Sequence, residues 1–238
     1  MNFSLRKRRR EKVERIKPIY IMHQAGLDEQ DLSSVLDGIR LVIQATKITP
    51  GLIQVKNWGV WRQEPYLDQY GLKPYHSVDW YLQRGQEESN RRNQLNADTI
   101  IRELYFEPWR KAQDHYDVFI TDDDLYSGDD NNNFVIGVAQ ELTGTVVSTA
   151  RFKGLGSHIR HECIVTEIMH EFGHVLGLIP DSRTSSVEYS LGPHCTNECV
   201  MRQGLSVPND WIRFTEDRIR TRRPFCRECQ GHLENWFR

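Results

Sequence analysis

The first three quarters of the chain alternate the hydrophobic patterns of strands and helices. A short apolar run at residues 19–22 predicts a buried strand, and apolar positions spaced three and four apart over residues 28–46 predict an amphipathic helix. Alternating positions over residues 52–61 and an apolar run at residues 117–120 predict two more strands, with a helical pattern over residues 97–111 between them. This alternation indicates an α/β (α+β) fold in which helices back a twisted mixed sheet.

The longest helical pattern is followed by a change of character. Residues 134–139 and 145–151 predict two strands, and residues 158–178 predict a helix that ends near Gly177. Residues 179–238 carry few strand signals and hold four of the five cysteines. We therefore expect a small, irregular C-terminal part.

Composition and charge narrow the class of protein. The 238 residues suffice for a hydrophobic core, and at a mean hydropathy of −0.62 there is no apolar run of the roughly 18 residues that a membrane span needs. The 31 basic and 33 acidic residues leave a formal charge of −2, which offers no net attraction for nucleic acid. Residues 1–17 are basic but lack the apolar core of an export signal. We expect a cytoplasmic monomer with a flexible arm at residues 1–17, an upper α/β part over 18–178 and a lower part over 179–238, and no membrane or nucleic-acid partner.

An H-E-x-x-H motif lies inside the predicted helix over residues 158–178. Four residues of helix turn by about 400° and rise about 6 Å, so His170 and His174 project from one face and can share a metal ion. Zinc accepts imidazole nitrogen and keeps an open position in catalytic sites. Glu171 is placed to reach a water on that metal and to act as its general base.

The third ligand of this site has three candidates. Gly177 stands where the helix must stop and the chain turn back toward the two histidines. Beyond it, Asp181, Glu188 and His194 are the nearest residues that can bind zinc. The spacing alone leaves all three open.

Two short-spaced pairs of cysteines predict a second metal site. Cys195 and Cys199 form one pair, and Cys226 and Cys229 form a C-x-x-C. Such pairs are typical of a closed tetrahedral structural zinc site. We therefore expect two Zn²⁺ ions per chain, one catalytic and one structural, and we expect Cys163 to be a buried free thiol.

With these motifs in place, the sequence resembles the archaemetzincins, metzincin-clan proteases whose signature runs H-E-x-x-H-x-x-G-x-x-H-C, then C-x-M, then C-x-x-C. The resemblance covers roughly residues 90–230 and includes three upstream segments, 121–126, 133–139 and 147–152. His194 follows His174 by 20 positions where the signature has six, and the leishmanolysins are a metzincin branch with an insertion at the same point. The matching positions are His170, Glu171, His174, Gly177, His194, Cys195, Cys199, Met201, Cys226 and Cys229.

The resemblance implies a fold, an activity and a ligand set. It implies a two-part metzincin fold, His194 as the third catalytic ligand, and Met201 as the methionine of a tight turn beneath the three histidines. It implies hydrolysis of peptide bonds in a peptide or protein substrate, as an endopeptidase or an aminopeptidase. The substrate would pair with a free sheet edge, for which the candidate residues are Phe134, Val135, Ile136, Gly137, Val138 and Ala139.

Two other functions fit the same residues. One is a zinc hydrolase of another clan, with Asp181 or Glu188 as the third ligand. The other is a non-catalytic, zinc-stabilised binding module whose basic residues contact nucleic acid. Those basic residues are Arg218, Arg220, Arg222 and Arg223.

Overall fold

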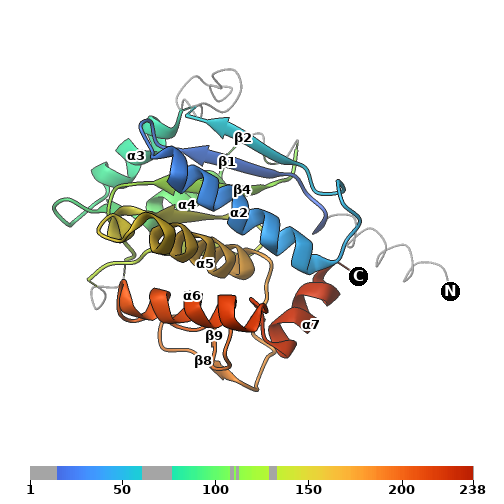
Figure 1. Cartoon of the computed structure of the whole chain (residues 1–238). Coiled ribbons are helices and arrows are strands. Elements are labelled where there is room, and N and C mark those ends of the chain that lie inside the picture. Colours follow the sequence, from blue (N-terminus) through green and yellow to red (C-terminus); the bar gives the residue numbers. More distant parts are fainter. Residues whose placement is uncertain (1–14, 61–76, 108–109, 111–112, 129–132, 238) are drawn as a thin grey trace.

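A five-stranded mixed sheet forms the centre of the computed structural model, which describes residues 15–60, 77–107, 110, 113–128 and 133–237. The strand order is β2-β1-β4-β7-β6; the first four strands are parallel, and β6 runs antiparallel to β7 at one edge (Figure 1). The strands are β1 (Ile19–His23), β2 (Val55–Gly59), β4 (Tyr116–Thr121), β6 (Gly137–Gln140) and β7 (Gly144–Ser148). A separate short pair joins β3 (Leu95–Asn96) to β5 (Leu125–Tyr126).

Helices cover both faces of the sheet. The helices α2 (Glu29–Thr46) and α5 (Ser157–Val175) lie side by side on one face (Figure 1). The other face carries α3 (Val78–Glu87) and α4 (Ala97–Tyr105). Alternation along the strands explains this division, because Val118 and Ile120 of β4 pack in the core with α2 and α5 whereas Phe119 packs with α3 and α4.

The C-terminal segment packs beneath α5. It contains a short antiparallel hairpin of β8 (Val187–Glu188) and β9 (His194–Cys195), followed by α6 (Asn209–Thr221) and α7 (Arg227–Trp236) (Figure 1). In the described part of the chain, no helix is both long and apolar enough to cross a membrane.

The observed architecture confirms the predicted mixed α/β fold, and several boundaries differ. The helix predicted over 97–111 ends at Tyr105, because a tighter turn follows in which the Glu107 amide donates to Leu104. The strand predicted over 52–61 is paired only at 55–59, and residue 61 lies outside the described residues. The helix α3 was not predicted from the hydrophobic pattern. Most of the predicted arm, residues 1–14, also lies outside the described residues.

The predicted strand over 134–139 joins the sheet only from Gly137. The reason is that its first residues bond elsewhere: Val135 forms an isolated bridge with Leu125, and the Ile136 carbonyl accepts from the Ser148 amide. The segment thus crosses from β5 to β7 before it becomes the edge strand β6.

Close contact between α2 and α5 holds the site-bearing helix in place. Arg160 of α5 forms an ion pair with the buried Asp31 of α2 at 2.5 Å. A Cβ atom on Gly38 of α2 would lie 2.7 Å from Cγ2 of Ile168 and 3.2 Å from the carbonyl oxygen of Val165. The two helix backbones therefore approach at a distance that only glycine permits.

We predict that Gly38→Ala destabilises the protein although alanine favours helix. The forced separation of α2 from α5 costs about 1–3 kcal/mol, which exceeds the gain in helix propensity of at most about 1 kcal/mol. Denaturant unfolding followed by circular dichroism measures the change. Gly231→Ala in α7 is the matched control, because nothing lies within 4 Å of the added Cβ there. Equal stability of the two variants would contradict the close contact.

Candidate active site and metal centres

The C-terminal end of α5 carries the H-E-x-x-H motif and then reverses the chain. Gly177 adopts a left-handed conformation (φ 60°), and its amide donates to the His174 carbonyl at 3.0 Å. The Leu178 amide donates to the Gly173 carbonyl at 3.1 Å, which completes a Schellman motif. The reversal ends the helix at Val175, three residues before the predicted end, and directs the chain back under α5.

Three histidines converge at this end of α5. His170 and His174 come from the helix, and His194 comes from β9. The ring centroid of His194 lies 5.2 Å from that of His170 and 4.9 Å from that of His174. One nitrogen from each of the three rings lies within 4.8 Å of the other two. We call these residues the histidine cluster.

The hydrogen bonds of the cluster leave nitrogens free for a metal. Nδ1 of His170 donates to the Val200 carbonyl at 2.7 Å, which leaves Nε2 as the lone-pair nitrogen. Nε2 of His174 is buried and has no hydrogen-bond partner among the described residues. Burial and the adjacent His194 lower the pKa of His170 to about 3, and burial likewise lowers the pKa values of His174 and His194. The rings are therefore neutral at pH 7, the form that binds zinc.

The residues first considered as alternative third ligands are not grouped with the three histidines, although Asp181 lines the same cleft. Asp181 and Glu188 are exposed, and neither belongs to a group of three potential ligands within the described chain. Glu188 pairs through its backbone with His194 in the β8–β9 hairpin. Directly opposed residues share a face of a hairpin, so Glu188 lies on the same side as His194, but only His194 is grouped with His170 and His174.

Glu171 lies beside the histidine cluster in a carboxyl pair that sequence reasoning missed. Its side chain packs directly under Gly137 of β6, as does that of the fully buried Glu167, one turn earlier on α5. Trp211 of α6 donates its indole N–H to Glu167. Burial raises the pKa of Glu167 to about 8, and burial with the neighbouring Glu167 raises the pKa of Glu171 above its usual range. The i, i+4 spacing of the two glutamates was the available signal.

Met201 packs against the same helix from below. It is fully buried, and its sulfur occupies the space beside Gly173 where any larger side chain would clash. The Met201 carbonyl accepts the Cys195 amide at 2.8 Å. The methionine therefore packs against α5 at Gly173, the residue directly before His174.

A cleft of about 710 Å³ opens over the histidine cluster and Glu171. The half-buried edge strand β6 and the segment leading into it form part of its wall. The six residues proposed from the sequence as the substrate edge, 134–139, all line this cleft. Within the described residues β6 is the last strand of the sheet, and no further strand pairs with its outer edge.

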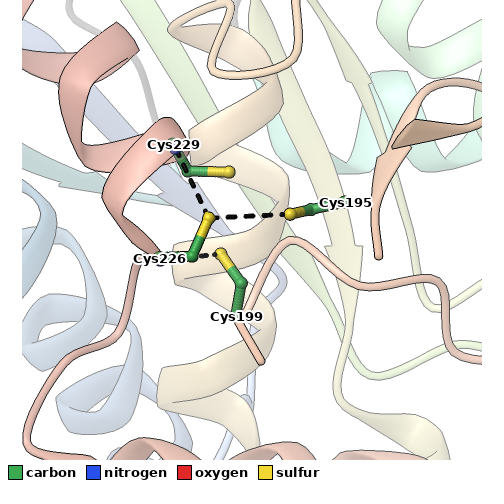
Figure 2. Close-up of side chains that lie close together, drawn as sticks. All are labelled: Cys195, Cys199, Cys226 and Cys229. Atoms are coloured by element: carbon green, nitrogen blue, oxygen red, sulfur yellow. Dashed lines mark hydrogen bonds between the residues drawn. The ribbon is translucent and has the colours of Figure 1, made fainter. Parts of the chain in front are cut away.

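The four cysteines Cys195, Cys199, Cys226 and Cys229 form a second cluster, which we call the cysteine cluster. Figure 2 shows their sulfurs pointing toward a common centre, with Cys226 and Cys229 at the start of α7, and Sγ of Cys195 lies 3.7 Å from Sγ of Cys226. No pair of them is a disulfide, and Cys163 is buried and free as expected. The four sulfurs all lie within 4.8 Å of one another. Four thiolates this close are the ligands of a closed zinc site.

A third group of potential ligands belongs to an ion-pair network. Glu107, His115 and Asp117 are buried together at the start of β4. Arg110 forms a salt bridge with Asp117, and Tyr81 donates to Glu107. A guanidinium among the ligands opposes cation binding, so this group is structural.

Curated relatives point to one family. The chain is 38% identical over 144 residues to an archaemetzincin of Archaeoglobus fulgidus, covering 60% of this chain and 70% of the relative. It is 41% identical over 88 residues to an archaemetzincin of Nanoarchaeum equitans, a match that spans 37% of this chain and only 39% of that relative. No protein-family model matches the chain.

Solved structures share the fold. An archaemetzincin from Methanopyrus kandleri superposes with a TM-score of 0.58 at 23% identity, covering 93% of this chain and 96% of that one. A zinc-dependent peptidase from Methanocorpusculum labreanum gives a TM-score of 0.55 at 20% identity, covering 90% and 99%. The identity with the Archaeoglobus fulgidus protein covers 70% of that relative, and the chain therefore belongs to the archaemetzincins, the family that its motifs resemble.

Proposed function

We propose that this chain hydrolyses peptide bonds with a water activated by zinc and by Glu171. The observation that carries the proposal is the convergence of three neutral histidines beside a carboxylate on the floor of a cleft whose wall is a free sheet edge. Such a site offers ligands for a metal, a general base beside them and a sheet edge that can hold an extended chain.

Each part of the site has a role in the reaction. His170, His174 and His194 would hold a zinc ion, which when bound polarises the scissile carbonyl and acidifies water. Glu171 takes the proton from that water and returns it to the leaving amine. The backbone of β6 aligns the substrate, so the scissile bond lies over the side chain packed beneath Gly137. The choice between endopeptidase and aminopeptidase depends on which end of the cleft the substrate fills.

The cysteine cluster would hold a second, structural zinc. All its ligands come from the lower part of the chain, over residues 195–229, where helices and loops share a small apolar core. A closed thiolate site supplies folding free energy to such a segment. We therefore propose two zinc ions per chain with different roles.

The nucleic-acid alternative has less support from the arginines that suggested it. Arg218 is largely buried and bonded to Glu162 and Thr166. Arg220 is paired with Asp217 at 2.7 Å. Arg218 and Arg220 thus contribute to the packing and ion pairing of α6, whereas Arg222 and Arg223 are exposed at its end.

Glu171→Gln should abolish cleavage and retain both metals, because the amide cannot accept the proton of the water. We expect turnover on a peptide that the parent cleaves to fall on the order of 10²- to 10⁴-fold. Peptide hydrolysis followed by mass spectrometry and zinc content by elemental analysis measure the two effects. Glu216→Gln, at an exposed site on α6, is the control. Near-normal turnover in Glu171→Gln would refute the assigned base.

His194→Ala should lose the zinc of the histidine cluster, because only two ligands remain there. Asp181→Ala and Glu188→Ala should bind zinc like the parent, since both carboxylates are exposed outside the cluster. Zinc affinity measured by chelator competition separates these outcomes. Retention by His194→Ala together with loss in either carboxylate variant would assign the site to a different class of zinc hydrolase.

Metal removal should affect the two parts of the protein unequally. We expect two zinc ions in protein purified under reducing conditions. Removing the zinc of the histidine cluster should leave the fold intact, whereas removing the zinc of the cysteine cluster should unfold the C-terminal segment. Elemental analysis and hydrogen exchange during stepwise chelation test this, and a count of one zinc or none would refute it.

A further inference from the structure

Arg183 lies in the 14-residue insertion between the two halves of the zinc-binding motif, and it is buried against the cysteine cluster. Its side chain is 2% exposed. Nη1 donates to Sγ of Cys229 at 3.1 Å and Nη2 to Sγ of Cys195 at 3.2 Å, so one guanidinium reaches one sulfur from each cysteine pair. Glu228 accepts from the same Nη2 at 2.7 Å.

The positive charge of the Arg183 guanidinium strengthens its hydrogen bonds to the two sulfurs. Four thiolates around Zn²⁺ carry a net charge of two negative, which is costly to bury without a counter-charge. Arginine remains charged at any pH of interest, and its fork donates several hydrogen bonds at fixed angles. The other donors to these sulfurs among the described residues include neutral groups: the Cys226 amide to Cys199, and the Asn197 side-chain amide and the Cys229 amide to Cys226. Within the described residues, Arg183 is the charged donor to this cluster.

The same guanidinium orders the hairpin that carries His194. It donates to the carbonyl oxygens of Ser185 and Ser186 at 2.9 Å each, and the Ser186 carbonyl also accepts the Thr196 amide at 3.0 Å. Ser186 leads directly into β8, which pairs with β9. Arg183 thus bonds at once to the cysteine cluster and to the base of the hairpin.

Strand geometry connects the hairpin to both clusters. His194 and Cys195 are neighbours on β9, and neighbouring strand residues point to opposite sides. One therefore faces the histidine cluster and the other the cysteine cluster. A shift of the hairpin relative to the cysteine cluster must move His194 relative to His170 and His174.

We propose that Arg183 is a positioning residue that docks the insertion onto the metal-loaded cysteine cluster and thereby sets the zinc affinity of the histidine cluster. Its side-chain hydrogen bonds go to the cysteine cluster, to Glu228 and to the segment before β8, so it acts on the histidine cluster through the β8–β9 hairpin. The inference rests on the two metal sites of the proposed function and not on peptide hydrolysis. A protein that binds two zinc ions and cleaves no peptide would refute that function and leave this inference standing.

The test measures zinc release from the two clusters separately in Arg183→Met and Arg183→Lys. Protein loaded with zinc is titrated with a chelator and its metal content followed. The sulfur-to-metal charge-transfer absorption of cobalt-substituted protein identifies the step that belongs to the cysteine cluster. We expect Arg183→Met to weaken metal binding at the histidine cluster about 10- to 100-fold, the range for residues that orient metal ligands. Arg183→Lys, which keeps the charge and loses the fork, should show a smaller loss.

Arg218→Met is the matched control, because Arg218 is also largely buried and paired with a carboxylate, and it donates to no sulfur. It should leave both metal affinities like those of the parent. If Arg183→Met fails to fold, as judged by circular dichroism, Arg183→Lys decides. Parent-like zinc affinity at the histidine cluster in a folded Arg183 variant would overturn the proposal, even where the cysteine cluster is weakened.

Discussion

The histidine cluster and the cysteine cluster meet at the single peptide bond between His194 and Cys195. Because the two residues belong to one short strand, the backbone that supplies a histidine to one cluster supplies a sulfur to the other. The Cys195 amide is bonded to the carbonyl of Met201, whose side chain packs under α5. Any displacement at this point therefore disturbs the histidines, the cysteines and the support of the helix together, and much of the lower part of the molecule serves to prevent it.

Burial leaves some nitrogen and oxygen atoms of the site without hydrogen-bond partners in the described part of the chain, and a metal ion can bind such atoms. Three histidines and two glutamates are collected within one sheet-and-helix core, where desolvation disfavours their charged forms. A nitrogen of His174 and an oxygen of Glu167 lack partners among the described residues. An unsatisfied buried polar atom costs about 1–3 kcal/mol, so the fold sustains this arrangement only because α5 is held on the sheet by α2. The packing of α5 against α2 and the sheet thus holds His170 and His174 in place to meet His194.

Sequence predicted the features that depend on local spacing. The H-E-x-x-H histidines share a helix face because the helical period requires it, and the left-handed Gly177 ends the helix where glycine was expected to. Several features that depend on distant contacts were missed. Nothing around Arg183 signals that its partners are Cys195 and Cys229, and Trp211 is 44 residues from the glutamate that it bonds. Strand ends were misplaced for the same reason, since the first residues of the predicted 134–139 strand bond to β5 and β7 instead of forming one ladder.

The insertion between His174 and His194 shows how a metal site tolerates added chain. A free loop of this length would let the third ligand sample many positions, at an entropic cost to metal binding. Here both ends are fixed, one by the helix reversal at Gly177 and the other by the thiol of Cys195. Between them the backbone pairs with itself as a hairpin and bonds through Arg183 to the second cluster. The added residues therefore contact the histidine cluster through the Gly192 carbonyl, which lies 3.1 Å from Nδ1 of His194. In our proposal they also hold His194 in place through Arg183.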